Sequence, residues 1–269
     1  MKILFCLNRD IHSYIFLDEL IKLIYLDADK ALIESIFAST VFFTERVGSK
    51  YSQDNAYLDL LENCEMNIPN KLERYSTKAV YFSKFVDTYA FKMLSVKDFN
   101  KEQLAKEFAE IRPDIILSIR FGKIFNDSMI KAAACPIINI HSGILPDYKG
   151  ILASFWSKKN HETEYGFTVH GIEDSGIDTG SIFYTERFKH DLDKCLFSTV
   201  HELYPSAAKF MKKFLVNFQI NPSKNKSFKQ DSSGAYFTKP ALEDFVEYEK
   251  AGLKILDRDY YWRLIDQYF

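Results

Sequence analysis

The sequence predicts an α/β fold, Rossmann-like, with a mostly parallel sheet that helices cover on both faces. Short continuous apolar runs occur at 2–7, 114–119 and 136–140, and such runs are typical of parallel strands buried on both sides. Segments with helical spacing of apolar residues separate these runs. This β-α-β alternation indicates a parallel sheet, whose ligands bind beyond the carboxyl ends of the strands.

The first half of the chain alternates in this way from its start. The run KILFCL at 2–7 predicts the first strand, and 10–29 carries apolar residues at helical spacing. The segment ALIESIFAST at 31–40 is ambiguous between strand and helix. Residues 50–95 are polar and rich in aromatics, with a helix expected within 72–92.

The middle of the chain repeats the alternation with clearer boundaries. Asn100 is a typical helix N-cap, and the amphipathic helix that it begins is expected to stop at Pro113. A strand at 114–119, a short helix at 126–134 and a strand at 136–140 follow.

The pattern changes after Gly150. Strands are expected at 165–173 and 181–188, joined by the turn DSGIDTG, and a long helix is expected at roughly 195–218. A polar segment at 221–234 has the composition of a linker. We therefore expect a catalytic domain at 1–220 and a short C-terminal extension at 221–269, ending in an amphipathic helix that packs on the body or on another subunit.

Composition narrows the function classes. The net charge of −2 supplies no basic field, so a nucleic-acid partner is not expected. The four cysteines are far apart and form no CxxC pair, so neither disulfides nor a metal site is expected. No apolar run approaches the roughly 18 residues that a membrane helix needs. These features predict a cytoplasmic protein without a membrane segment.

Three polar residues could form a reaction site. Asn139 and His141 lie at the end of an apolar strand, in NIHSGILPDYKG, and Asp178 lies in the Gly-flanked turn. An amide donor, a titratable imidazole and a carboxylate suit acyl transfer to an amine, because the amine loses a proton and the intermediate carries an oxyanion. Each motif alone is weak, since an N-x-H pair is common by chance and the turn alone reads as a hairpin.

Together the motifs resemble the folate-dependent formyltransferase family. That family's pattern is N-x-H, an L-P-x-Y-x-G loop and a downstream D-x-G-x-D-T-G turn, all present here between Asn139 and Gly180. The resemblance implies N10-formyltetrahydrofolate as the formyl donor, no metal, and Asn139, His141 and Asp178 as the catalytic trio. It also implies folate contacts at Arg120, Gly122, Ile124, Phe125 and Asp174. For Ile124 and Phe125, plain core packing is an equal alternative.

The acceptor is less constrained, and the branch that acts on nucleotide-linked amino sugars is the most similar. Transfer-RNA formyltransferases resemble one another in carrying a further barrel domain. Glycinamide ribonucleotide formyltransferases resemble one another in a Gly-rich phosphate loop after the first strand, and at that position this chain reads LNRDIHSYIF, which contains no glycine. We expect a dTDP- or UDP-linked 4-amino- or 3-amino-dideoxy sugar as the acceptor. Methionyl-tRNA or glycinamide ribonucleotide formylation, a formyl-folate hydrolase and a non-catalytic folate- or nucleotide-binding relative remain alternatives.

The remaining site predictions concern the acceptor. Tyr236 and Phe237 could stack on its base, with tail packing as an equal alternative. Basic residues could meet its diphosphate: Lys71, Arg74 and Lys78. His170 is expected to be structural, and the other histidines are expected on the surface: His12, His161, His190 and His201. The resemblance places the sugar branch in O-antigen and lipopolysaccharide biosynthesis, and a homodimer is the expected assembly on base rates.

Overall fold

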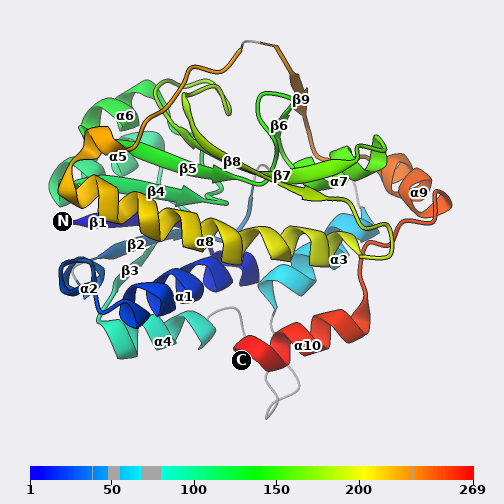
Figure 1. Cartoon of the computed structure of the whole chain (residues 1–269), viewed down its shortest axis with the longest axis horizontal. Coiled ribbons are helices and arrows are strands. Elements are labelled where there is room, and N and C mark those ends of the chain that lie inside the picture. The colour runs from blue at the N-terminus through cyan, green and yellow to red at the C-terminus, as the bar shows by residue number, and fades with distance from the viewer. Residues whose placement is uncertain (38, 48–54, 68–79, 232) are drawn as a thin grey trace.

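The computed structural model of the chain describes residues 1–37, 39–47, 55–67, 80–231 and 233–269 (Figure 1). Its centre is a seven-stranded sheet with the order β3-β2-β1-β4-β5-β7-β8. The first five of these strands are parallel, and β7 and β8 run antiparallel to their neighbours. The predicted fold class is therefore confirmed.

The strands of the main sheet are short and mostly buried. Their bounds are β1 (Ile3–Asn8), β2 (Thr40–Thr44), β3 (Lys92–Ser95), β4 (Ile115–Ile119), β5 (Ile137–His141), β7 (Glu164–Gly171) and β8 (Ile182–Lys189). Every residue of β1 and β4 is buried, as expected for central strands that helices cover on both faces. Because β1, β4 and β5 are parallel neighbours, their carboxyl ends meet at one edge of the sheet.

Helices cover both faces of the sheet. On one face, α1 (Ile11–Leu26) and α8 (Leu196–Ile220) lie side by side, as Figure 1 shows. On the other face, α5 (Lys101–Ile111) packs against α6 (Asp127–Ala133). Each face encloses its own cluster of buried apolar side chains. This layered packing holds the strand ends in fixed positions.

Local signals explain several helix boundaries. Asn100 forms a capping box with Gln103 at the start of α5, as its sequence position predicts. The ambiguous segment 31–40 divides into α2 (Lys30–Phe37) and the start of β2. Within 72–92, α4 spans Val80–Tyr89, and residues 72–79 lie outside the part of the chain that the structure describes.

The C-terminal residues return to the body of the protein. After η1 (Pro222–Lys224), β9 (Ala235–Phe237) pairs in parallel with β6 (Tyr148–Gly150), which precedes α7 (Ala153–Lys159). Two further helices follow, α9 (Leu242–Lys250) and α10 (Arg258–Tyr268), and α9 contacts α3 (Ala56–Met66). Buried side chains of both C-terminal helices belong to the main core: Phe245, Tyr248, Tyr261, Leu264 and Ile265. The last helix thus packs on the body.

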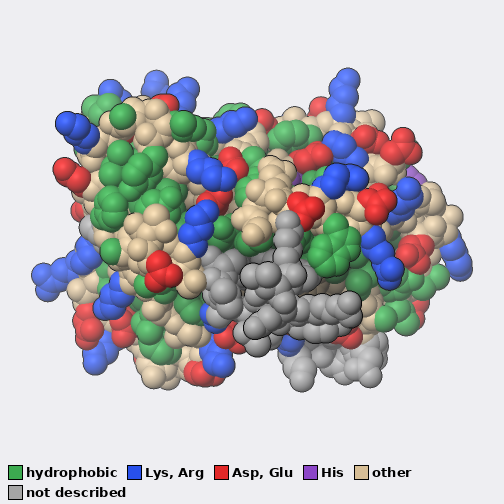
Figure 2. All heavy atoms as spheres, turned by 90° about the horizontal axis from the view of Figure 1, so that it is seen from below, with side chains coloured by type: hydrophobic (Ala, Val, Ile, Leu, Met, Phe, Trp, Pro, Cys, Tyr) green, Lys and Arg blue, Asp and Glu red, His purple; other side chains and the backbone are tan. Residues whose placement is uncertain are grey.

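The surface mixes charges of both signs. Figure 2 shows basic and acidic side chains interspersed over the face that it presents, in keeping with the small net charge of −2. Within the described part of the chain, none of the helices combines the length and the hydrophobicity that crossing a membrane requires.

Candidate active site

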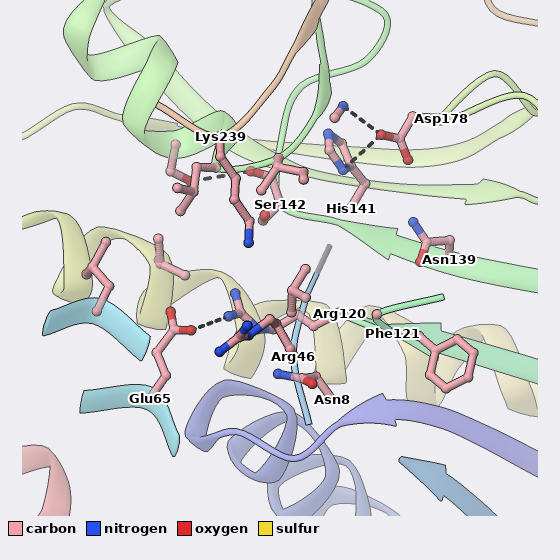
Figure 3. Close-up of a pocket in the computed structure, with 18 of the residues that line it drawn as sticks. Asn8, Arg46, Glu65, Arg120, Phe121, Asn139, His141, Ser142, Asp178 and Lys239 are labelled. Atoms are coloured by element: carbon pink, nitrogen blue, oxygen red, sulfur yellow. Dashed lines mark hydrogen bonds and ion pairs between the residues drawn. The ribbon is translucent and has the colours of Figure 1, made fainter. Parts of the chain in front are cut away.

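A cavity of about 270 Å³ opens at the carboxyl ends of β1, β4 and β5. This is the position at which open α/β sheets bind their ligands. Residues after β4 and β5 line one side, α3 lines another, and residues beside β6 and β9 complete the wall. Figure 3 shows Asn139, His141 and Asp178 at one end of it, and Lys239, Arg46 and Glu65 toward the other.

The three predicted catalytic residues all line this cavity. Asn139 and His141 point to the same face of β5 because side chains two residues apart on a strand share a face. Asp178 belongs to the turn between β7 and β8, where its backbone adopts a left-handed conformation with φ of 55°. That turn carries its carboxylate over the strand end, where the Gly150 N–H donates to Oδ2 over 2.8 Å.

His141 is buried and is held at both ring nitrogens. Its Nε2 lies 2.6 Å from the carbonyl oxygen of Tyr148, so we assign the ring proton to Nε2. Its Nδ1 faces Oδ2 of Asp178 at 3.5 Å. The imidazole of His141 thus lies directly beside the Asp178 carboxylate.

His170 also belongs to the site, although sequence reasoning assigned it a structural role. It is the direct cross-strand partner of Asn139 in the antiparallel β5–β7 pair. Its Nε2 lies 3.1 Å from the Asn139 side-chain nitrogen, and its Nδ1 lies 2.8 Å from the Gly171 carbonyl oxygen. With the proton on Nδ1, Nε2 accepts from the Asn139 amide and fixes its orientation. The second N–H of the Asn139 amide is not used in this hydrogen bond.

The Asp178 carboxylate is ionised at neutral pH. Burial alone would raise the pKa of Asp178, but attraction to protonated His141, the interactions with protonated His170 and the hydrogen bond from the Gly150 N–H outweigh it, so the pKa lies well below the usual range. The site thus combines a fixed amide donor, a buried imidazole and a fixed negative charge. It can stabilise an oxygen that gains negative charge and accept a proton beside it.

Of the five predicted folate contacts, three line the cavity and two do not. Gly122 lies where an added Cβ would meet the Arg46 carbonyl oxygen at 1.8 Å, so only glycine fits there. Ile124 is 58% exposed at the rim. Phe125 is buried in the second core cluster, stacked on Phe108. Asp174 shapes the catalytic turn by accepting hydrogen bonds from the Gly176 N–H and the Thr179 hydroxyl.

Arg120 also lines the cavity, but its guanidinium is bound to the protein. Its Nε donates to Asp10 over 2.7 Å and its Nη2 donates to Glu65 over 2.6 Å. Burial disfavours the charged form, yet the two carboxylates raise the pKa of Arg120 above its ordinary value. Arg120 therefore joins β4 to α1 and α3 beneath the cavity.

The predicted acceptor contacts are distributed differently. Tyr236 is 52% exposed and lines the cavity. Phe237 instead stacks on Tyr148 and Trp156, with ring centroids 5.1 Å and 5.3 Å away, and does not line it. Lys71, Arg74 and Lys78 lie outside the residues that the structure describes. Two cations that sequence reasoning missed, Arg46 and Lys239, line the wall, and neither belongs to a recognisable motif.

The surface prediction is wrong for two histidines. His12 is buried between the rings of Phe197 and Tyr204, beside Glu65. His201 is buried on α8, and its Nδ1 lies 2.5 Å from the Tyr260 hydroxyl. His12 lies where α1 packs on α8 and His201 lies where α8 meets α10, and single positions in an apolar sequence do not reveal such packing. His161 is exposed, as expected.

Comparison with known proteins gives one family. A family description named "Formyl transferase" matches residues 62–217. The chain is 29% identical over 161 residues to a methionyl-tRNA formyltransferase of Kosmotoga olearia, covering 59% of this chain and 50% of that protein. It is 31% identical over 102 residues to a GDP-perosamine N-formyltransferase of Brucella melitensis, covering 38% and 39%. The chain therefore matches half or less of the length of these relatives.

Solved structures share the fold. The N-formyltransferase from Helicobacter canadensis, in complex with folinic acid and dTDP-3-aminofucose, superposes with a TM-score of 0.59 at 18% identity, covering 96% of this chain and 85% of that one. A sugar N-formyltransferase from Shewanella sp. gives 0.54 at 16% identity, covering 92% and 86%.

Proposed function

Since the chain belongs to the formyl transferase family, we propose that it moves a formyl group from N10-formyltetrahydrofolate to the amino group of a nucleotide-linked, dTDP- or UDP-bound, 4-amino- or 3-amino-dideoxy sugar. The observation that carries the proposal is the meeting of Asn139, His141 and Asp178 at the end of one cavity. Asp178 is ionised there, which suits removal of a proton from an amine.

The proposed chemistry assigns one task to each residue. The acceptor amine attacks the formyl carbon, and the Asn139 amide donates to the oxygen that becomes negative. His141, facing Asp178, takes the proton that the nitrogen loses. The carbon–N10 bond of the donor then breaks and N10 gains a proton, so that tetrahydrofolate leaves. His170 holds Asn139 and is a positioning residue.

The donor fits the side of the cavity formed by the β4 exit and the catalytic turn. In this proposal Gly122 lets the chain pass close to Arg46, and exposed Ile124 offers an apolar edge to a flat ring system. Phe125 and Asp174 act indirectly, by holding the loop and the turn. Lys78 remains a proposed acceptor contact.

Two observations support an amino-sugar acceptor: the similarity to known formyltransferases and the capped N-terminus of α1. One neighbour cited above is described as a sugar N-formyltransferase, the other as an N-formyltransferase in complex with dTDP-3-aminofucose, and one relative is a GDP-perosamine N-formyltransferase. Phosphate binding in glycinamide ribonucleotide would need an open N-terminus on α1, but the Asp10 carboxylate caps it by accepting from the Ser13 N–H. Formylation of methionyl-tRNA is the second candidate, favoured by the Kosmotoga relative.

An acceptor screen tests the proposal. Purified protein and N10-formyltetrahydrofolate are incubated with dTDP-, UDP- and GDP-linked amino sugars, with glycinamide ribonucleotide and with methionyl initiator tRNA, and the products are identified by mass. We expect a formamido sugar as the product. Formylation of tRNA alone would replace this proposal with the second candidate, and release of formate without an acceptor would indicate a hydrolase.

We also propose a cytoplasmic homodimer whose product enters O-antigen or lipopolysaccharide biosynthesis. Exposed aromatic residues such as Trp262 on α10, 49% exposed, are available for a subunit contact. Light scattering after size exclusion measures the oligomeric state, and a monomer at micromolar concentration would contradict the dimer.

A further inference from the structure

The anion site that this fold usually offers is already occupied by the protein itself. The N-terminus of α1 follows β1, and its amides favour a negative group. Here the Asp10 carboxylate, fully buried, accepts from the Ser13 N–H over 2.8 Å and from the Asn8 amide over 2.7 Å. It also pairs with Arg120. An acceptor with phosphate groups must therefore place them elsewhere in the cavity.

Arg120 and Lys123 are cations on the described lining whose polar groups are held by the protein. Arg120 pairs with Asp10 and Glu65, and its side chain is only 14% exposed. The Lys123 ammonium donates to the carbonyl oxygens of Lys97 and Phe99, over 3.0 Å and 2.6 Å. The Arg120 side chain is also more deeply buried than that of Arg46, 14% against 35% exposed, and is therefore less accessible to a large anionic ligand.

Arg46 and Lys239 also line the cavity. Arg46 follows β2, and its side chain is 35% exposed, although its Nε and Nη2 both donate to Glu62 of α3. Lys239 follows β9, and Figure 3 shows its ammonium group reaching into the cavity on the side where Arg46 lies. This end lies away from Asn139 and Asp178, so that a ligand can extend from one end to the other.

The electrostatics of this pair favour a negative ligand. Burial and the charge of Arg46 lower the pKa of Lys239, while Glu62 opposes the shift. Positive charges on a partly buried wall are stabilised when an anion binds against them. An anion with several oxygens, such as a diphosphate, can contact both groups at once.

We propose that Arg46 and Lys239 form the anion-binding end of the cavity and hold the diphosphate of a nucleotide-linked acceptor. This inference rests on the proposed function and adds a location to it. Tyr236 lies three positions before Lys239 on the same segment and also lines the cavity. Its exposed ring is then placed to receive the base beyond the diphosphate.

Binding of a nucleoside diphosphate without donor or sugar tests the inference directly. Calorimetric titration of dTDP and UDP into the wild-type protein and into Lys239→Gln is expected to show an affinity loss of about 10-fold or more, as for loss of a charge-assisted hydrogen bond. Lys239→Arg should retain most of the affinity. Lys209→Gln, which removes an exposed lysine of α8 outside the lining, is the matched control.

Arg46 needs a paired variant because its loss would leave Glu62 without this partner. The double variant Arg46→Gln/Glu62→Gln keeps the local net charge, and thermal unfolding checks its fold. It should weaken dTDP or UDP binding to a similar extent as Lys239→Gln. Unchanged affinity in both variants, or no binding by the wild type, would overturn the inference.

Steady-state kinetics shows whether the two cations bind the diphosphate of the acceptor or the carboxylates of the donor. Lys239→Gln should raise the KM for the amino-sugar nucleotide and leave the KM for formyltetrahydrofolate unchanged. A change in the donor KM alone would assign the two cations to the donor's carboxylates and overturn the inference. If the wild type binds nucleoside diphosphates through Lys239 yet formylates no nucleotide sugar, the anion site stands and the proposed function fails.

Discussion

The Nε2 atom of His170 lies 3.4 Å from Oδ1 of Asp178, while Oδ2 of the same carboxylate faces the second imidazole, His141. One buried carboxylate thus serves two histidines from opposite oxygens. This arrangement contributes to the lowered pKa of Asp178 and links His170, which contacts Asn139, to His141, to which the proposed function assigns proton transfer.

Replacing Asp178 with Asn should abolish most of the activity and leave the fold intact. Asn can keep the hydrogen bond from the Gly150 N–H and tolerates the left-handed backbone, so the change removes mainly the charge. We expect kcat/KM for formyl transfer to fall by about 100-fold or more. Asp147→Asn, which alters an exposed carboxylate just before β6, is the control. Near-full activity of Asp178→Asn would contradict the catalytic assignment.

Replacing His170 with Gln should lower kcat by about 10-fold or more with little change in either KM, because Asn139 loses the partner that orients it. The variant should also alter the pH profile of kcat/KM, since a group beside Asp178 has been removed. A purely structural role predicts lower thermal stability with an unchanged profile, so the profile decides between the two.

Substitutions of Tyr236 and Phe237 should have different effects, the first on acceptor binding and the second on stability. Tyr236→Ala is expected to raise the acceptor KM several-fold with little change in thermal stability, because its ring is exposed in the cavity wall. Phe237→Ala should lower the free energy of unfolding by about 2 kcal/mol, since its ring packs on Tyr148 and Trp156. Denaturant unfolding and steady-state kinetics measure the two effects. The reverse pattern would exchange their roles.

His201 should make the protein less stable in mild acid. Burial and the charge of His12 lower the pKa of His201 to about 3, below the value of about 6.5 for an unfolded chain. Below pH 6.5 the unfolded state therefore binds a proton that the folded state does not. Between pH 7.5 and pH 5.0 this residue should cost about 2 kcal/mol of unfolding free energy. His201→Gln should lose less over that range than the wild type, whereas the exposed-site variant His161→Gln should match the wild type.

The parts of the fold that the sequence predicted are those with local signals. Continuous apolar runs predicted β1, β4 and β5, and Asn100 predicted the start of α5. Asn139 and His141 were expected at a ligand site because they end a parallel strand, whereas Asp178 was assigned to the same site by the resemblance of the combined motifs to a known family.

The missed residues depend on pairings between distant segments. His170 joins the site only through the register that places it opposite Asn139 in an antiparallel pair. Phe237 turns away from the cavity because β9 pairs with β6, bringing its ring onto Tyr148. Lys239 follows β9 and lines the cavity as a result of the same strand pairing. Neither register nor pairing partner can be read from periodicity, since both are decided by packing across the whole domain.

The pairing of β9 with β6 also has a consequence for the order in which the chain is made. A ribosome working from the N-terminus has delivered Asn139, His141 and Asp178 before it reaches the strand that carries Tyr236. During synthesis the three proposed catalytic residues therefore precede the strand that completes the other end of the cavity. Under the proposed function, the acceptor side is completed last, when residues 235–239 pack against Tyr148–Gly150.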